Sequence, residues 1–267
     1  MRFILSNVKR FLGDDAGFSL LELSVALAVM GIVAASGLSL MGARVSAVQQ
    51  KVTRDHQTFL LKSLANYLLS QGKLPCPSQD LKGYAKKTCK NPSEAVGYVP
   101  FETLGLTSKI AQDGWGKVMR YGVHPQMTER LDAVNEDKTE AICKVEEGPL
   151  VIQKDGAIIS PPPSNPFSVV LYSQGSAIGA LSESERINDA QDLVFVEKDY
   201  ITHKEHPHRH LLVHKTRNDL LGHYAGFSCP AYINQVNLLK RQKAPLEGEE
   251  MPVMSSGEPP PDFSWGD

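Results

Sequence analysis

The chain has 267 residues, of which 42% are hydrophobic and 22% charged, and its formal net charge at neutral pH is −2. This balance is typical of a globular protein of one or two domains, and the sequence has no cluster of Arg and Lys interleaved with aromatic residues, which argues against a nucleic-acid-binding protein. Four cysteines occur, Cys76, Cys89, Cys143 and Cys229, without a C-x-x-C pair, which argues against a zinc ribbon or a thioredoxin-like redox site.

The N-terminus combines a short leader, residues 1–17, with an apolar run, residues 18–43, whose one charged residue is Glu22. About 20 helical residues span a bilayer, so the run predicts a transmembrane segment and is too long for the apolar core of a secretory signal peptide. A carboxylate in hydrocarbon costs roughly 2.5–3.5 kcal/mol on insertion scales. A plain membrane anchor explains the length of the run but does not explain Glu22.

The helical pattern continues beyond the apolar run and becomes one-sided. After Ala43, apolar residues recur at spacings of three, four or seven with polar residues between them, which is typical of an amphipathic helix. Gly72 suits a left-handed C-cap and Pro75 cannot continue a helix. We therefore expect one long helix over residues 18–72, whose second half packs against the domain that follows.

The segment Gly17-Phe18-Ser19-Leu20-Leu21-Glu22, with a basic leader before it and an apolar stretch after it, resembles the N-terminus of type IV prepilins. In that family a membrane peptidase cuts after the glycine, here Gly17, and methylates the new N-terminal residue, here Phe18. The family's glutamate, here Glu22, pairs with the terminal amine of a neighbouring subunit. The resemblance thus implies that a buried acid meets a cation on assembly.

Residues 73–235 alternate short apolar runs with turn formers and predict strands within 97–106, 113–123, 148–159, 167–175, 192–200 and 209–216. Asp155-Gly156 is a hairpin signal. A helix followed by strands predicts an α+β head with an antiparallel sheet packed on the long helix, and the resemblance implies a type IV pilin-like fold. We expect the Pro- and Glu-rich residues 236–267 to form a disordered tail.

Two further segments carry the resemblance into the head. The L-P-C-P segment at 74–77 resembles that of a group of pilin-like bacterial proteins, and the turn at 113–116, with Trp115, is similar to the D-P-W-G turn of the major type II secretion pseudopilin. We expect Trp115 to anchor the core of the sheet.

Four cysteines allow three pairings. We expect Cys76 to pair with Cys89, because these two lie close together in a turn-rich stretch, and Cys143 to pair with Cys229 across a longer loop.

Two segments raise the question of a metal ion. His208 and His210 belong to a His-rich segment, residues 203–214, where a polar loop entering a strand is the expected structure and a metal site the alternative. The loop at 172–192 lies where the major pseudopilin carries a calcium loop, and Ser173, Asp189 and Asp192 offer oxygen ligands, but the early acidic residues of that loop are missing. We assign no metal ligand, cofactor or catalytic residue.

These features predict a non-enzymatic, pilin-like subunit of a bacterial type II secretion pseudopilus or type IV pilus. The expected partners are the prepilin peptidase, other pilin or pseudopilin subunits, the inner-membrane assembly platform and the lipid bilayer, and no nucleic acid. The expected location is the inner membrane, with the head in the periplasm. The alternative is a single-pass anchored extracytoplasmic domain that binds a metal or a ligand through residues 203–214.

Overall fold

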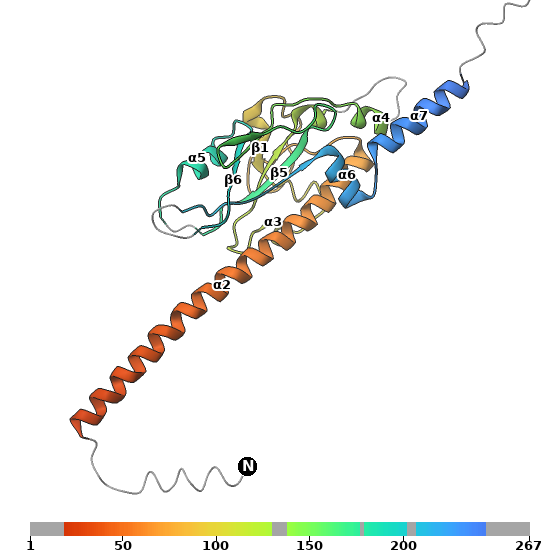
Figure 1. Cartoon of the computed structure of the whole chain (residues 1–267). Helices are drawn as coiled ribbons and strands as arrows, with labels where there is room; N and C mark the ends of the chain where they lie inside the picture. Colours follow the sequence, from red (N-terminus) through yellow and green to blue (C-terminus); the bar gives the residue numbers. More distant parts are fainter. Residues whose placement is uncertain (1–18, 130–137, 177–178, 202–206, 244–267) are drawn as a thin grey trace, which may run out of the picture.

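The computed structural model describes residues 19–129, 138–176, 179–201 and 207–243, and a long N-terminal helix dominates it. This helix, α2, runs over Leu20–Gln71 (Figure 1). The Ser19 hydroxyl accepts a hydrogen bond from the Leu21 N–H at its start, and Gly72 ends it in the left-handed conformation with φ 71°. At 1.5 Å per residue, α2 is roughly 80 Å long. The predicted helix and its glycine stop are therefore present, within the described residues.

The head contains two sheets. In the first, β1 (Val96–Tyr98), β2 (Arg120–Val123), β5 (Phe167–Ser173) and β7 (Leu211–Thr216) lie in the order β1-β2-β5-β7, and every pair is antiparallel. In the second, β3 (Val151–Lys154) lies between β4 (Ala157–Ile159) and β6 (Val194–Glu197).

The α+β class predicted from the sequence is confirmed, with one difference. The hairpin between β3 and β4 turns at Asp155 and Gly156, which both have positive φ as a two-residue type I′ turn requires. On the other side of β3, however, β6 pairs in parallel, so the head is not built from antiparallel strands alone.

Seven further helices lie before, between and after the strands of the described residues. They are η1 (Pro92–Glu94), α3 (Ser108–Ala111), η2 (Pro125–Thr128), α4 (Lys138–Cys143), α5 (Glu183–Asp189), α6 (Arg217–Ala225) and α7 (Cys229–Lys243). Helix α7 corrects the domain boundary expected at residue 235, because the chain stays helical to Lys243. The rest of the expected tail, residues 244–267, lies outside the described residues.

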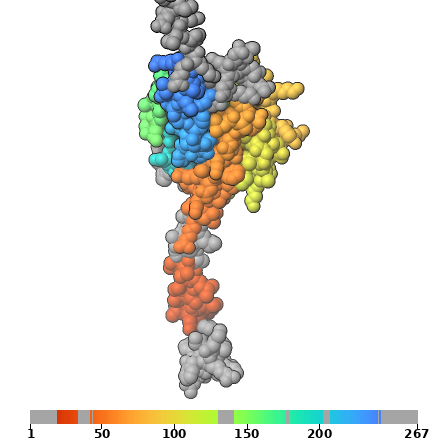
Figure 2. All heavy atoms as spheres, turned by 90° about the vertical axis from the view of Figure 1, so that its right-hand side faces the viewer, coloured from red at the N-terminus to blue at the C-terminus, as the bar shows by residue number. Residues whose placement is uncertain are grey.

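The core forms where the second half of α2 meets the head. The side chains of Leu60, Leu61, Leu64, Ala65 and Leu68 are almost completely buried. They belong to one hydrophobic cluster with residues of the central strands β2 and β5, among them Tyr121 and Leu171. Figure 2 shows the head gathered around this part of the helix, while the red N-terminal part stands clear of it. The fold thus divides α2 into a head-bound half and a projecting half.

Candidate functional site

The projecting half of α2 exposes apolar side chains on all its sides. Between Leu20 and Val33 the large hydrophobic residues range from 52% exposed at Leu23 to 87% exposed at Leu20. A helix that is apolar all round is stable where its surroundings are not water, as in a membrane or a bundle of similar helices. In the single subunit this surface has no cover from the head (Figure 1).

Glu22 lies in the first turn of this exposed half. Its position near the helix N-terminus is one where the helix dipole favours a carboxylate. The Ser24 hydroxyl donates a hydrogen bond to the Leu21 carbonyl at 2.7 Å, so the backbone of the same helix satisfies this polar side chain. Gly17 and Phe18, the expected processing residues, lie outside the described residues. Within the part of the chain that the structure does describe, no helix is both long enough and apolar enough for a membrane span.

The turn at 113–116 clamps the head onto α2. The Thr53 hydroxyl accepts a hydrogen bond from the Gly114 N–H at 2.9 Å, and His56 Nδ1 lies 2.7 Å from the Gln112 carbonyl. Gly114 approaches so closely that a Cβ atom would lie 2.1 Å from the Gln49 carbonyl oxygen. A glycine is therefore required where this turn crosses the helix.

Asp113 ties the same turn to the end of β5. Its carboxylate accepts hydrogen bonds from the Trp115 and Lys117 N–H groups and from the Ser173 hydroxyl, the last at 2.5 Å. Trp115 is half-buried and stacks on Tyr200 with ring centroids 5.7 Å apart, so it joins two surface segments and is not the core anchor expected from the sequence.

The loop after β5 folds around an internal cation. Arg209 donates from its guanidinium to both carboxylate oxygens of Glu185 and to the Ala180 carbonyl. The Arg209 and Glu185 side chains are 5% and 0% exposed. Burial raises the pKa of Glu185, but hydrogen bonds from Arg209 and from the Ser182 backbone outweigh it and hold this pKa at about 2. The pair is thus charged, buried and fully hydrogen-bonded at neutral pH.

The three candidate calcium ligands of this loop each form hydrogen bonds with different groups of the protein. Ser173 binds Asp113, Asp189 accepts from Tyr172 and Gln174, and Asp192 accepts from the Val194 N–H. Among the described residues, no group of three or more His, Cys, Asp or Glu side chains is arranged to hold a metal ion.

The His-rich segment enters strand β7 at Leu211, as expected, but its two central residues are buried and do not belong to a polar surface loop. His208 and His210 are 2% and 0% exposed, and their Nδ1 atoms face Ser184 and Asn188. Among the described residues, their Nε2 atoms have no hydrogen-bond partner. Burial lowers the pKa of both, that of His210 to about 4. Both imidazoles are therefore neutral parts of the core at pH 7. His203 and His206 lie outside the described residues.

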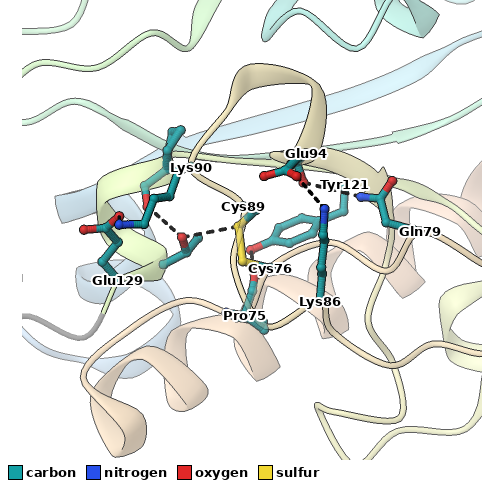
Figure 3. The surroundings of a disulfide bond; sticks show 11 residues. Pro75, Cys76, Gln79, Lys86, Cys89, Lys90, Glu94, Tyr121 and Glu129 are labelled. Atoms are coloured by element: carbon teal, nitrogen blue, oxygen red, sulfur yellow. Dashed lines mark hydrogen bonds and ion pairs between the residues drawn. A yellow bond between two sulfur atoms is a disulfide. The ribbon is translucent and has the colours of Figure 1, made fainter.

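Two disulfides join the expected pairs of cysteines. Cys76–Cys89 fastens the loop that follows α2, and Cys143–Cys229 fastens the start of α7 to α4. Figure 3 shows the first bond, with Tyr121 donating to the Pro75 carbonyl and Lys90 pairing with Glu129 beside it. All four cysteines are buried.

A long helix with an apolar, projecting half and an α+β head packed on one side of its other half defines a pilin-like protein. Comparison with known proteins agrees with this class. Residues 13–38 match the family described as the prokaryotic N-terminal methylation motif. The chain is also 32% identical over 118 residues, 43% of its length, to type II secretion system core protein G of Klebsiella michiganensis, of which it covers 80%.

No solved structure matches the chain significantly. The methylation motif and the relative together show the family: this chain belongs to the type IV prepilin-like proteins and is a pilin-like filament subunit. Pilins and pseudopilins are in general structural subunits and not enzymes.

The structure adds residues that the sequence did not single out. Arg209 and Glu185 lie 24 positions apart in the sequence. The available signal was the S-x-x-E pattern of Ser182 and Glu185, which forms a capping box at the start of α5 with both of its hydrogen bonds present. Gly114 belongs to the turn at 113–116 that the sequence pattern predicts, but its close approach to α2 follows only from the packing.

Proposed function

We propose that this chain is a subunit of a type II secretion pseudopilus or a type IV pilus, cleaved after Gly17 and assembled through α2. The observation that carries the proposal is the division of α2. Its head-bound half buries an apolar stripe within the subunit, whereas its projecting half exposes apolar side chains that only other molecules can cover. Helices of this kind cover one another in the core of a filament.

Glu22 gives this assembly its polarity. In the proposed filament its carboxylate pairs with the amine of Phe18 of a neighbouring subunit, which processing has exposed. A charge buried without a partner is strongly unfavourable, and two opposite charges that meet in a dry interface offset much of that cost. The single subunit therefore carries a charge whose partner arrives with the next subunit.

The proposed location is the bacterial inner membrane, with the head on the periplasmic side. The apolar run 18–43 supports membrane storage of the subunit before assembly, because its length matches a bilayer. The two disulfides support an oxidising compartment for the head. The proposed partners are the prepilin peptidase, other subunits of the filament and the assembly platform of the inner membrane.

The subunit acts by assembly and not by turnover. The alternative, a membrane-anchored domain that binds a metal or a ligand through residues 203–214, is less well supported. Its central residues, His208 and His210, point into the core and face Ser184 and Asn188.

The intact mass of the membrane-extracted protein tests the proposal. We expect the mass of residues 18–267 plus one methyl group and minus four hydrogens for the two disulfides. We expect Gly17→Val to leave most of the protein uncut, with Gly42→Val as the matched control that is cut normally. A chain that keeps Met1, or begins at another residue, contradicts the proposal and favours a plain anchor.

A further inference from the structure

A lysine-lined hollow lies beside the Cys76–Cys89 disulfide, just after the end of α2. Its volume is about 230 Å³, and its lining includes Lys73, Lys87, Lys90 and Glu129, with the hydroxyl-bearing Thr88 and Thr128. Figure 3 shows three of the lining residues, with Lys90 and Glu129 facing each other beside Cys89. A pocket and a cluster of positively charged side chains therefore lie at the same place on the head.

The positive charge of this hollow is not balanced within the described head. Glu129 pairs with Lys90 at 3.0 Å. Lys86, on the same loop, pairs with Glu94 at 2.6 Å. Lys73 and Lys87 have no carboxylate of the described residues within ion-pair distance. Three lysines against one glutamate leave two positive charges in the lining of a chain whose net charge is −2.

The loop that carries the lysines is held in place. The disulfide fastens Cys89, and the Tyr121 hydroxyl donates to the Pro75 carbonyl at 3.1 Å. The Leu74 N–H donates to the Met127 carbonyl at 2.7 Å. Because these bonds fix the backbone on both sides of the hollow, an anionic partner has to order the lysine side chains but not the loop, which lowers the entropy lost on binding.

The sequence offers one strongly acidic segment of matching charge. Residues 244–267 contain six acidic residues and no Lys, Arg or His. Four of the acids are Glu247, Glu249, Glu250 and Glu258, and two of these are adjacent. Multiple weak ion pairs at one surface reinforce each other when the chain already tethers the partners.

The segment starts close enough to reach the hollow. Helix α7 leaves the head at the end where α2 and α4 also stop (Figure 1), and the Cys143–Cys229 bond fixes its base there. The 15 residues of α7 rise roughly 22 Å. Fifteen residues of extended chain beyond Lys243 span up to about 50 Å, which is more than enough for a return to the head.

We propose that the acidic C-terminal segment, residues 244–267, docks on the lysine-lined hollow of its own subunit, with its carboxylates paired to Lys73 and Lys87. The docked segment covers the hollow and supplies carboxylates to two lysines that have no carboxylate partner among the described residues. This proposal does not depend on the filament function.

Zero-length carbodiimide cross-linking of the full chain in detergent tests the docking. A mixture of ¹⁴N- and ¹⁵N-labelled protein distinguishes cross-links within a chain from those between chains. We expect Lys73 and Lys87 to form amide bonds with acids of residues 244–267 of the same isotope. Because ion pairs are screened by salt, the yield is expected to fall several-fold in about 0.5 M NaCl.

Two sets of variants complete the test. Lys73→Ser with Lys87→Ser removes the cross-links, whereas Lys62→Ser with Lys109→Ser, at exposed lysines elsewhere, leaves them unchanged. Replacing Glu247, Glu249, Glu250 and Glu258 by Gln, which leaves the head intact, increases amine labelling of Lys73 and Lys87 at least twofold. Cross-links spread evenly over the head's lysines, cross-links of mixed isotope alone, or unchanged labelling each overturn the proposal.

Discussion

The two halves of α2 belong to one continuous helix but meet different surroundings. Leu27 in the projecting half is 61% exposed, whereas Leu64 in the head-bound half is fully buried. The head-bound half presents apolar residues on one side, so a single contact with the head covers them. The projecting half presents them all round, so no single domain can do so. The comparison shows that half of this helix is specified for the subunit and half for its assembly.

The charge in the projecting half gives the largest expected effect. We expect Glu22→Ala to abolish or strongly reduce filament incorporation, since an unpaired amine of Phe18 in the interface costs about 3–5 kcal/mol per contact. Membrane insertion and cleavage after Gly17 should persist. Processing and incorporation are measured side by side, with Asp55→Ala, at an exposed acid on the head-bound half, as the control. Normal incorporation of Glu22→Ala means that this acid has no role in assembly.

A matched pair of leucine variants separates the halves by stability. Leu64→Ala leaves a cavity in the core and should lower the free energy of unfolding of the head by about 2–5 kcal/mol. Leu27→Ala should leave this free energy unchanged, because Leu27 does not touch the head. Urea unfolding in detergent, followed by Trp fluorescence, measures both. An equal loss in the two variants contradicts the division of α2.

Acid should weaken the head and spare the projecting half, which contains no histidine. Burial lowers the pKa of His210 to about 4 and also lowers those of His124 and His208. The unfolded chain therefore binds protons first, and stability is lost as pH falls from 6.5 towards 4, by at most about 3 kcal/mol for His210. Glu185, whose pKa is held at about 2, adds a second loss as pH falls from 4.5 towards 2.

Unfolding curves between pH 7.5 and 4.5 measure this loss. His210→Phe should flatten the dependence on pH, and His223→Gln, at an exposed histidine of α6, should leave it unchanged. Asp189 and Glu185 oppose the lowered pKa of His210, whereas His208 and Arg209 reinforce it. If the free energy of unfolding does not change between pH 7.5 and 4.5, these histidines are not buried in their neutral form.

The smallest effect is expected where the head crosses the helix. Gly114→Ala places a Cβ atom against the Gln49 carbonyl, so the turn must move away from α2, at a cost of about 1–3 kcal/mol. Gly31→Ala meets open space and should stabilise the projecting half slightly, because alanine favours helix more than glycine does. In thermal unfolding, Gly114→Ala should lower the Tm and Gly31→Ala should not. A Tm unchanged by Gly114→Ala contradicts a tight clamp.

Local signals made the helix, the strands and the disulfide pairs predictable. Gly72 suits the left-handed C-cap of α2 and Pro75 cannot continue a helix, and both effects follow from the residue type alone. Asp155-Gly156 identifies its hairpin turn in the same way. The parallel pairing of β3 with β6 joins residues that lie 43 positions apart, and no local sequence pattern indicated it. The boundary at 235 was misplaced because the acidic, Pro-rich composition beyond Lys243 outweighed the helical spacing of Tyr232, Val236 and Leu239.

The candidate site was predictable in its linear motif and not in its packing. Gly17, Phe18 and Glu22 follow one another closely in sequence, so a motif identifies them. The buried pair of Arg209 and Glu185 requires α5 to pack beside the segment before β7, and the same packing buries His208 and His210. Histidine is amphipathic enough to suit a polar loop or a core, so its sequence pattern alone did not decide between them.

The Cys143–Cys229 bond has a mechanical consequence. A filament that is pulled or retracted loads its subunits along the chain, and hydrogen-bonded strands yield under load before covalent bonds do. This disulfide closes a loop that contains strands β3 to β7. Tension applied between α2 and α7 therefore bypasses those strands and leaves only the stretch before Cys143, itself shortened by Cys76–Cys89, free to extend.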